Sequence, residues 1–198
     1  MLESEIVRNG YNKIALNYYA NRDLTKFYPE LERFSELLPE YGHILDVGTG
    51  IGVPTAKFLI EKGFKVTGID ISTTMILQAK KNVPEANFLE MDALHLNFDE
   101  NTFDGVISVY TLFHIPRIKH ENLFRTFYKI LKPKGILVIN SGISESEGII
   151  QFFGVPMFWS NFSPKKTLNL VERVGFSIIF EGVLKRGGEL QYWIFAHK

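Results

Sequence analysis

A short apolar run that ends in three alternate glycines is the feature that most limits the fold of this 198-residue chain. The run is His43–Val47, and Gly48, Gly50 and Gly52 follow it shortly before Pro54. Glycine tolerates positive φ and leaves no Cβ in the way of a ligand, and proline suits the first turn of a helix. The pattern predicts a buried strand, a tight turn and then a helix, with free backbone N–H groups facing a nucleotide-type ligand.

Strands and helices alternate along most of the chain, which predicts an α/β fold with a doubly wound, mostly parallel sheet. We expect strands near residues 43–47, 65–70, 86–91, 104–109 and 135–140. We expect helices near residues 3–20, 25–38, 53–62, 73–82 and 117–131, and a last helix after Ser163 and Pro164. The apolar segments 176–180 and 190–196 are too close for a crossover helix, so they should pair antiparallel. One domain should span 1–198, with a helical cap over 1–40 and a sheet core over 41–198.

Three aspartates lie at the ends of the first three predicted strands. Asp46 lies at the start of the glycine motif, Asp70 ends the second strand and Asp92 follows the third. An acidic residue about 20 positions beyond the glycines is the usual acceptor for ribose hydroxyls, and Asp70 stands at that distance from Gly50. The glycine spacing is not the dinucleotide G-x-G-x-x-G, and Asp46 would repel a phosphate but suits an ammonium group. We therefore expect a cofactor with a ribose and a cationic tail.

Four motifs occur in chain order, each at a predicted strand end. They are Asp46–Gly52, Gly68–Ser72, Met91–Ala93 and Leu131–Gly135. With them the chain resembles the class I S-adenosylmethionine-dependent methyltransferases, from about residue 11 to its end. It is most similar to the small-molecule branch (methyltransferase type 11/25 domain) that includes the ubiquinone/menaquinone C-methyltransferases. The resemblance implies a Rossmann-like sheet of seven strands with an antiparallel last strand, a helical lid, and S-adenosylmethionine as cofactor with S-adenosylhomocysteine as product.

The glycine turn and two aspartates receive cofactor roles from this resemblance. Gly48, Gly50 and Gly52 should let the backbone approach the methionine part of the cofactor, although tight packing of strand on helix also favours glycine. Asp70 should accept both ribose hydroxyls, because one carboxylate offers two oxygens. Asp46 should hydrogen-bond the turn or the cofactor ammonium, and a mainly structural role stays open.

The adenine and the floor of the site are expected to involve five further residues. Ile71 and Met75 would flank the adenine, although either residue is equally suited to the core. Asp92 should accept from the exocyclic amine of the adenine, with the backbone N–H of Ala93 facing a ring nitrogen; a solvated turn aspartate is the alternative. Ser108, at the end of the fourth predicted strand, should meet the cofactor through its backbone.

Three side chains are candidates for the reacting end of the site. His114 is the histidine to test as a general base, since its unperturbed pKa is near 6.5; a polar loop residue that orients the next helix is the alternative. Tyr11 and Tyr19 lie on or beside one amphipathic helix face. In the resembled family such a helix covers the cofactor, and an aromatic ring near the sulfonium is favourable through cation–π attraction. Simple docking of the helix on the sheet is the other interpretation.

An aromatic-rich segment over residues 148–160 lies between the fifth strand and the last helix. In the resembled family this region lines the acceptor pocket, so it should form an apolar substrate wall. A dimer contact or a separate hydrophobic minicore would give the same composition.

Composition excludes several other classes. Lys plus Arg and Asp plus Glu number 22 each, so no net charge favours nucleic acid or an anionic membrane. The chain has no cysteine, which excludes disulfides and thiolate metal ligands, and we predict no metal site. No signal peptide or membrane-spanning run is visible. We expect a cytoplasmic protein that is a monomer or a homodimer.

These observations predict transfer of a methyl group from S-adenosylmethionine to a small-molecule acceptor by in-line displacement. The sulfonium is already activated, so the protein would mainly align the acceptor and exclude water. An NAD-dependent oxidoreductase with a Rossmann-type fold is one alternative, against which the glycine spacing and Asp92 count. A non-catalytic S-adenosylmethionine-binding regulator is another, and the sequence leaves it open.

Overall fold

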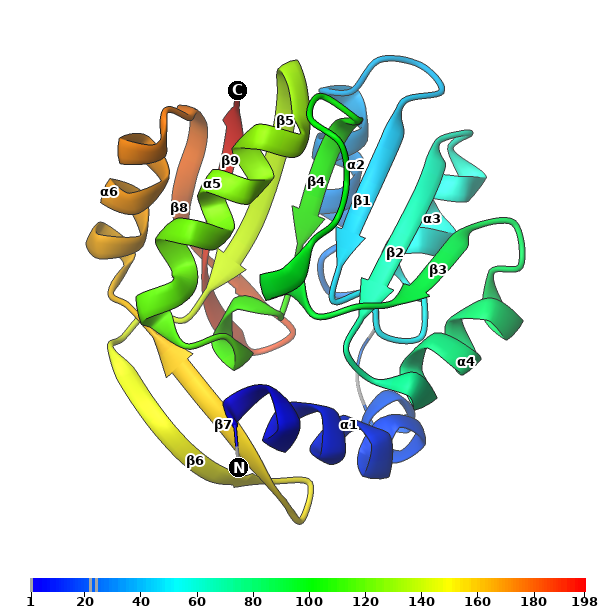
Figure 1. Ribbon diagram of the computed structural model, residues 1–198, viewed down its shortest axis with the longest axis vertical. Coiled ribbons are helices and arrows are strands. Elements are labelled where there is room, and N and C mark those ends of the chain that lie inside the picture. The colour runs from blue at the N-terminus through cyan, green and yellow to red at the C-terminus, as the bar shows by residue number, and fades with distance from the viewer. Residues whose placement is uncertain (1, 22, 24) are drawn as a thin grey trace.

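The computed structural model describes residues 2–21, 23 and 25–198, and it contains a seven-stranded sheet in the order β3-β2-β1-β4-β5-β9-β8 (Figure 1). The strands are β1 His43–Val47, β2 Lys65–Asp70, β3 Asn87–Glu90, β4 Phe103–Ser108, β5 Leu131–Ser141, β8 Ser177–Arg186 and β9 Glu189–His197. Strands β1 to β5 are parallel, whereas β9 runs antiparallel to both β5 and β8. The predicted fold class and its antiparallel last strand are confirmed.

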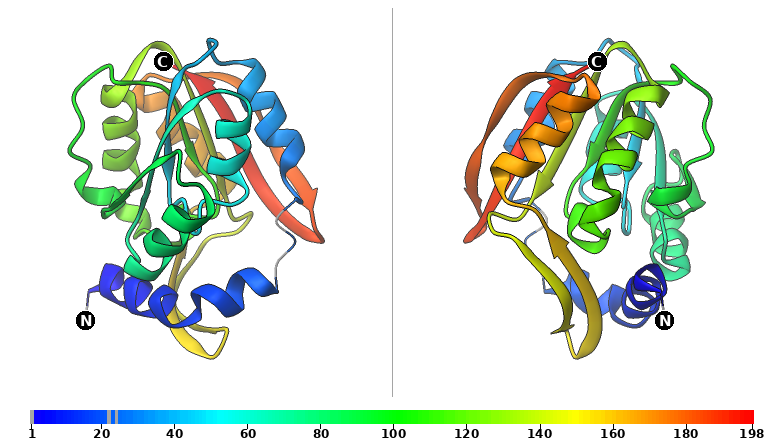
Figure 2. Two further views of the ribbon diagram at one scale, coloured as in Figure 1. Left: turned by 90° about the vertical axis from the view of Figure 1, so that its right-hand side faces the viewer. Right: turned by 60° about the vertical axis from the view of Figure 1, so that its left-hand side comes forward.

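Helices cover both faces of the sheet, which gives three layers (Figure 2). One face packs against α2 Tyr28–Glu36, α3 Thr55–Glu61 and α4 Thr73–Asn82, and the other against α5 His120–Ile130 and α6 Pro164–Val174. Short 3₁₀ turns are η1 Ala93–His95, η2 Leu112–His114 and η3 Arg117–Lys119. The central strands β1 and β4 are buried at almost every position because helices cover both faces of the sheet.

Local signals set most of the helix ends. Ser72 caps α4 by accepting a hydrogen bond from the backbone N–H of Met75, and Gly175 ends α6 at a φ of 116°. Ser163 precedes α6 as predicted, but its side chain makes no capping hydrogen bond. The helix expected over 117–131 is divided into η3 and α5, and its last residue already begins β5.

The remaining helix and a hairpin lie together beyond the carboxyl ends of the parallel strands (Figure 1). The helix is α1 Glu3–Ala20, and the hairpin is formed by β6 Ser146–Phe152 and β7 Val155–Asn161. They share a small core to which α1 contributes Val7, Ile14 and Tyr18 and β7 contributes Met157 and Phe158. The aromatic segment therefore belongs to a small separate hydrophobic core, which was one of the alternatives to a substrate wall. In the part of the chain that the structure describes, no residue of 148–160 lines the main pocket, so the expectation of a substrate wall is wrong for this arrangement.

Candidate active site

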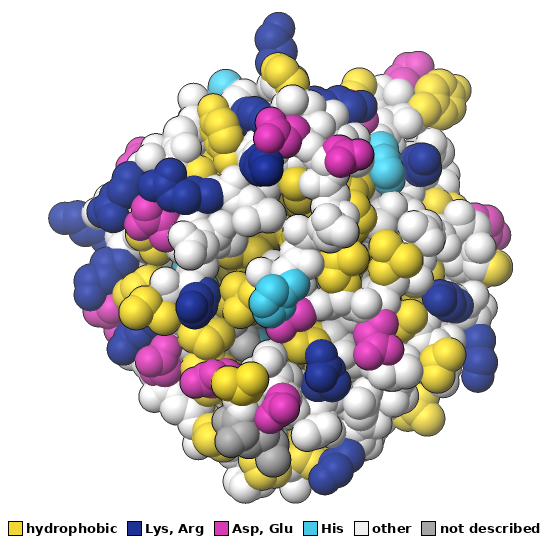
Figure 3. Space-filling view, in the orientation of Figure 1, with side chains coloured by type: hydrophobic (Ala, Val, Ile, Leu, Met, Phe, Trp, Pro, Cys, Tyr) yellow, Lys and Arg dark blue, Asp and Glu magenta, His cyan; other side chains and the backbone are white. Residues whose placement is uncertain are grey.

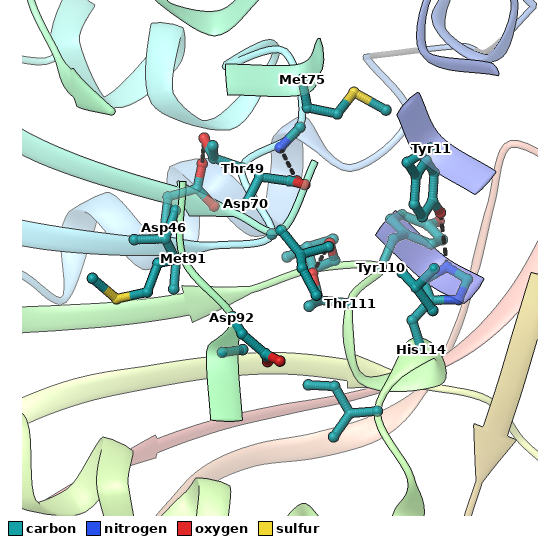
Figure 4. Close-up of a pocket in the computed structure, with 18 of the residues that line it drawn as sticks. Tyr11, Asp46, Thr49, Asp70, Met75, Met91, Asp92, Tyr110, Thr111 and His114 are labelled. Atoms are coloured by element: carbon teal, nitrogen blue, oxygen red, sulfur yellow. Dashed lines mark hydrogen bonds between the residues drawn. The ribbon is translucent and has the colours of Figure 1, made fainter. Parts of the chain in front are cut away.

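A cavity of about 470 Å³ lies between α1 and the carboxyl ends of β1 to β4 (Figure 4). Its volume is in the range of small-molecule sites, and its place at the strand ends is where open α/β sheets bind ligands. Most of the predicted site residues line it, namely Tyr11, Tyr19, Asp46, Gly48, Gly50, Asp70, Ile71, Met75, Asp92, Ala93 and His114. The cavity therefore brings together predicted residues from α1 and from the ends of four strands.

Two predicted residues do not line the cavity. Ser108 is completely buried at the end of β4. Gly52 faces the core, where an added Cβ would lie 3.0 Å from the ring of Phe88. For Gly52 the structure therefore favours the alternative of close strand–helix packing. The cofactor role of Ser108 remains a prediction that rests on its backbone.

The N–H groups of the glycine turn are used inside the protein, contrary to the expectation of free donors. Gly48 and Thr49 both donate to the carbonyl of Ile69, at 2.8 and 2.9 Å. The N–H of Gly50 donates to Oδ2 of Asp70 at 3.0 Å. The turn therefore ties β1 to β2, and the N–H groups of Gly48, Thr49 and Gly50 are not free for a phosphate.

Gly48 and Gly50 are required by space as well as by backbone conformation. Their φ angles are 75° and 57°, in the left-handed region that favours glycine. A Cβ on Gly48 would overlap the side chain of Thr111, and a Cβ on Gly50 would overlap the hydroxyl of Tyr19. Helix α1 thus reaches the turn directly, and any side chain at Gly50 would fill this part of the cavity.

Asp46 and Asp70 are buried or partly buried carboxyl groups on adjacent strands. Oδ2 of Asp46 accepts the hydroxyl of Thr49 at 2.6 Å, so its predicted hydrogen bond to the turn is present (Figure 4). Oδ1 of Asp70 accepts the N–H of Ser72 at 2.9 Å. Burial raises the pKa of Asp46 to about 7 and that of Asp70 to about 6, against the hydrogen bonds that lower both. Cationic or hydroxyl donors in the cavity would favour the ionised forms.

Asp92 lies at the start of η1, where its Oδ1 accepts the N–H of Leu94 at 2.9 Å. Its other oxygen is 3.6 Å from Nδ1 of His95. The carboxylate therefore caps a turn, as the alternative proposed, while it also lines the cavity beside Ala93.

Tyr11 and His114 form a hydrogen-bonded pair that sequence reasoning did not predict. Nε2 of His114 is 2.7 Å from the hydroxyl of Tyr11, and Nδ1 is 2.9 Å from the carbonyl of Phe158 on β7 (Figure 4). A carbonyl only accepts, so Nδ1 carries the proton in the neutral ring, and Tyr11 donates to the lone pair of Nε2. Burial lowers the pKa of His114 to about 4, which keeps the ring neutral near pH 7.

Several lining residues were missed because no motif marks them. Thr111 donates its hydroxyl to the carbonyl of Val47 at 2.9 Å and so joins the ends of β4 and β1. Lys119 and Asn122 reach the cavity from the start of α5, and Lys26 reaches it from the segment between α1 and α2. Their place in the cavity follows only from the three-dimensional position of α1 and η3 over the strand ends.

Two further features, a cluster of metal-binding side chains and a membrane-spanning helix, were sought among the described residues. No group of three or more histidine, cysteine, aspartate or glutamate side chains within 2–21, 23 and 25–198 could hold a metal ion. No described helix is long and apolar enough to cross a membrane. On the face seen in Figure 3, acidic and basic side chains are interspersed, and hydrophobic side chains show between them.

Comparison with known proteins places these features in a family. The model of the methyltransferase domain matches residues 45–139, which include the glycine turn and all three aspartates. A demethylmenaquinone methyltransferase of Symbiobacterium thermophilum is 28% identical over 177 residues, which are 82% of this chain and 68% of that protein. Three further curated methyltransferases are matched over only 62%, 26% and 25% of their own length.

Solved structures share the fold over the full chain. The [4+2]-cyclase SpnF superposes with a TM-score of 0.79 and 17% identity, covering 100% of this chain and 97% of that one. The magnesium protoporphyrin IX methyltransferase of Synechocystis, with S-adenosylmethionine bound, gives a TM-score of 0.77 at 17% identity over 100% and 98%. At such low identity these likenesses establish the architecture alone.

Proposed function

We propose that this chain, which belongs to the class I S-adenosylmethionine-dependent methyltransferases, transfers a methyl group from S-adenosylmethionine to a small-molecule acceptor by in-line displacement. The observation that carries the proposal is the pairing of Asp46 and Asp70 around a glycine turn whose N–H groups are already used. Such a site suits a ribose and a cationic tail, and the N–H groups of Gly48, Thr49 and Gly50 are not free for a dinucleotide pyrophosphate.

The residues present fit this cofactor. Asp70 would hold the ribose hydroxyls, Asp92 the adenine amine and Asp46 the ammonium group, while Gly50 lets the hydroxyl of Tyr19 approach the turn. The two raised pKa values also fit, because a carboxyl that is costly to ionise alone gains most from a cation beside it. When bound, S-adenosylmethionine supplies an activated methyl group.

The protein's own contribution is alignment, exclusion of water and management of one proton. Helix α1 covers the strand ends (Figure 1), and its Tyr11 and Tyr19 line the cavity on that side. For an acceptor that must lose a proton, the hydroxyl of Tyr11 takes that proton while its own passes to Nε2 of His114. The carbonyl of Phe158 favours the resulting imidazolium by accepting from Nδ1.

The first experiment is calorimetric titration of the protein with S-adenosylmethionine and S-adenosylhomocysteine, with NADH as control. We expect micromolar binding of the first two ligands and none of NADH. Tight binding of NADH alone would establish an oxidoreductase instead. Because a cyclase shares this fold, turnover is tested separately with a mixed set of small phenols, amines and acids. Cofactor binding without turnover of any acceptor would favour a regulator.

A further inference from the structure

Besides the positions proposed for the ribose, adenine and ammonium groups, the cavity has a group of lining residues that is here called the acceptor lobe. Its inner wall is apolar or aromatic and is formed by Val7, Tyr11, Leu94, His114, Ile115 and Pro116. It includes Tyr11, whose hydroxyl is the proposed proton-accepting group, and its hydrogen-bond partner His114. An acceptor that fills the lobe therefore needs an apolar body, and the methylated atom must face Tyr11.

Two polar side chains line the acceptor lobe at its solvent-exposed rim. Lys119 and Asn122 lie three residues apart at the start of α5, a spacing that places side chains on the same face of a helix. Both residues are exposed, and within the described part of the chain Lys119 takes part in no ion pair. An ammonium group and an amide N–H donor side by side match the two oxygens of a carboxylate.

Two exposed acidic side chains that line the cavity, Glu3 and Asp23, lie on α1 or shortly after its end rather than on α5. Glu3 lines the cavity from the first turn of α1, and it is exposed. An anionic group that enters the lobe is therefore repelled from the α1 side and attracted to the α5 side. That asymmetry orients a molecule with one charged end, because only one direction of entry pairs unlike charges.

We propose that the methyl acceptor is a small organic acid, whose apolar body occupies the acceptor lobe and whose carboxylate lies against Lys119 and Asn122. This inference rests on the proposed function, and it names the substrate class for the same site. The carboxylate fixes the orientation, and the opposite end of the molecule presents its hydroxyl or amine to Tyr11.

Binding of matched probes to the protein loaded with S-adenosylhomocysteine tests this proposal without requiring turnover. The probes are 4-hydroxybenzoate, 4-hydroxyphenylacetate and 4-hydroxycinnamate, each compared with its primary amide by ligand-observed NMR. The amides have nearly the same shape but no charge. We expect at least one acid to bind roughly two- to fivefold more tightly than its amide, as suits an exposed ion pair. The preference should shrink as salt is raised from 0.05 to 0.5 M, since the rim is solvated.

Variants decide which residues are responsible. Lys119→Met should remove the preference for the acid, whereas Lys80→Met, an exposed lysine on α4 that does not line the cavity, should leave it unchanged. Glu3→Gln should strengthen binding of the acid. Equal binding of acids and amides, no binding of any acid, or a preference that survives in Lys119→Met would overturn the proposal. Failure of the proposed function would show differently, as absent cofactor binding in the calorimetric titration.

Discussion

The side-chain oxygen of Asn12 accepts the hydroxyl of Ser72 at 2.7 Å, and this contact fastens α1 to the end of the strand that carries Asp70. The same oxygen accepts the N–H of Thr74 at 3.2 Å, and Arg8 donates to the carbonyl of Ile71 at 3.3 Å. The helix that covers the cavity is therefore bound to the segment that would hold the ribose and adenine. Closure of the site and the geometry of the cofactor-binding segment are coupled through Asn12 and Arg8.

Replacement of Asn12 should loosen that closure. Asn12→Ala removes the acceptor for two donors, one of them the buried hydroxyl of Ser72, so we expect a loss of about 1–2 kcal/mol in the free energy of unfolding. Amide hydrogen exchange in α1 should become faster, and S-adenosylhomocysteine should bind more weakly. Asn9→Ala, at an exposed position of the same helix, is the matched control. Unchanged exchange in α1 would show that Asn12 does not hold the helix.

Variants of Tyr11 and His114 should lose turnover while they keep their affinity for S-adenosylhomocysteine. Tyr11→Phe leaves the ring in place and removes the proton carrier, and His114→Gln removes the imidazole. We expect both variants to lose turnover by about 10²–10⁴-fold on an acceptor that must give up a proton, with little change in the dissociation constant of S-adenosylhomocysteine. Because the pKa of His114 is lowered to about 4, its protonation should not reduce the wild-type rate between pH 6 and 8. Equal rates in the wild type and both variants would show that the two residues have only a structural role.

Much of this architecture could be predicted from local patterns. The apolar run before Gly48, the cap at Ser72 and the close apolar segments near the C-terminus each depend on neighbours in the chain, and the structure confirms the elements they predicted. The clustering of Asp46, Asp70 and Asp92 also followed, because parallel strand ends meet at one edge of the sheet.

Contacts between distant segments could not be predicted in this way. The hydrogen bond between Tyr11 and His114 joins residues 103 positions apart, and the carbonyl that fixes the tautomer belongs to the hairpin β6–β7. In residues 148–160 aromatic side chains occupy adjacent positions on both faces of the strands. The sequence therefore lacks the alternation of apolar and polar residues that would predict a hairpin, and it favoured a substrate wall instead. The glycine pattern alone does not show that the carbonyl of Ile69 on β2 accepts the N–H groups of Gly48 and Thr49.

The collision of any Cβ at Gly50 with Tyr19 gives a test of how closely α1 approaches the turn. Gly50→Ala combines a positive φ with overlap of the Tyr19 hydroxyl, so stability should fall by about 2 kcal/mol or more. Gly188→Ala has a similar φ of 83° but no atom within 4 Å of the added Cβ, so it reports backbone strain alone. Urea unfolding of both variants isolates the contact. Losses of equal size would mean that Tyr19 moves away without cost.

The raised pKa values of Asp46 and Asp70 predict opposite effects of pH on the free protein and on cofactor binding. A carboxyl with a higher pKa in the folded than in the unfolded state holds its proton more tightly when folded. Its contribution to stability is therefore full below the ordinary pKa of 3.8, which the carboxyl has in the unfolded chain, and is lost as pH rises through about 6 for Asp70 and about 7 for Asp46. Without ligand, these two groups should lower the free energy of unfolding between about pH 4 and pH 7.

Binding of S-adenosylmethionine should reverse that effect, because its hydroxyl and cationic groups favour the ionised carboxylates. Affinity should increase from pH 5.5 to 7.5, and binding at pH 6 should release protons. Calorimetry in two buffers of different ionisation enthalpy measures that release directly. Asp46→Asn should remove the upper part of the pH dependence, and Asp70→Asn should weaken binding at every pH because the ribose loses its charged acceptor. An affinity that is flat with pH, with no proton release in either buffer, would show that neither carboxyl ionises on binding.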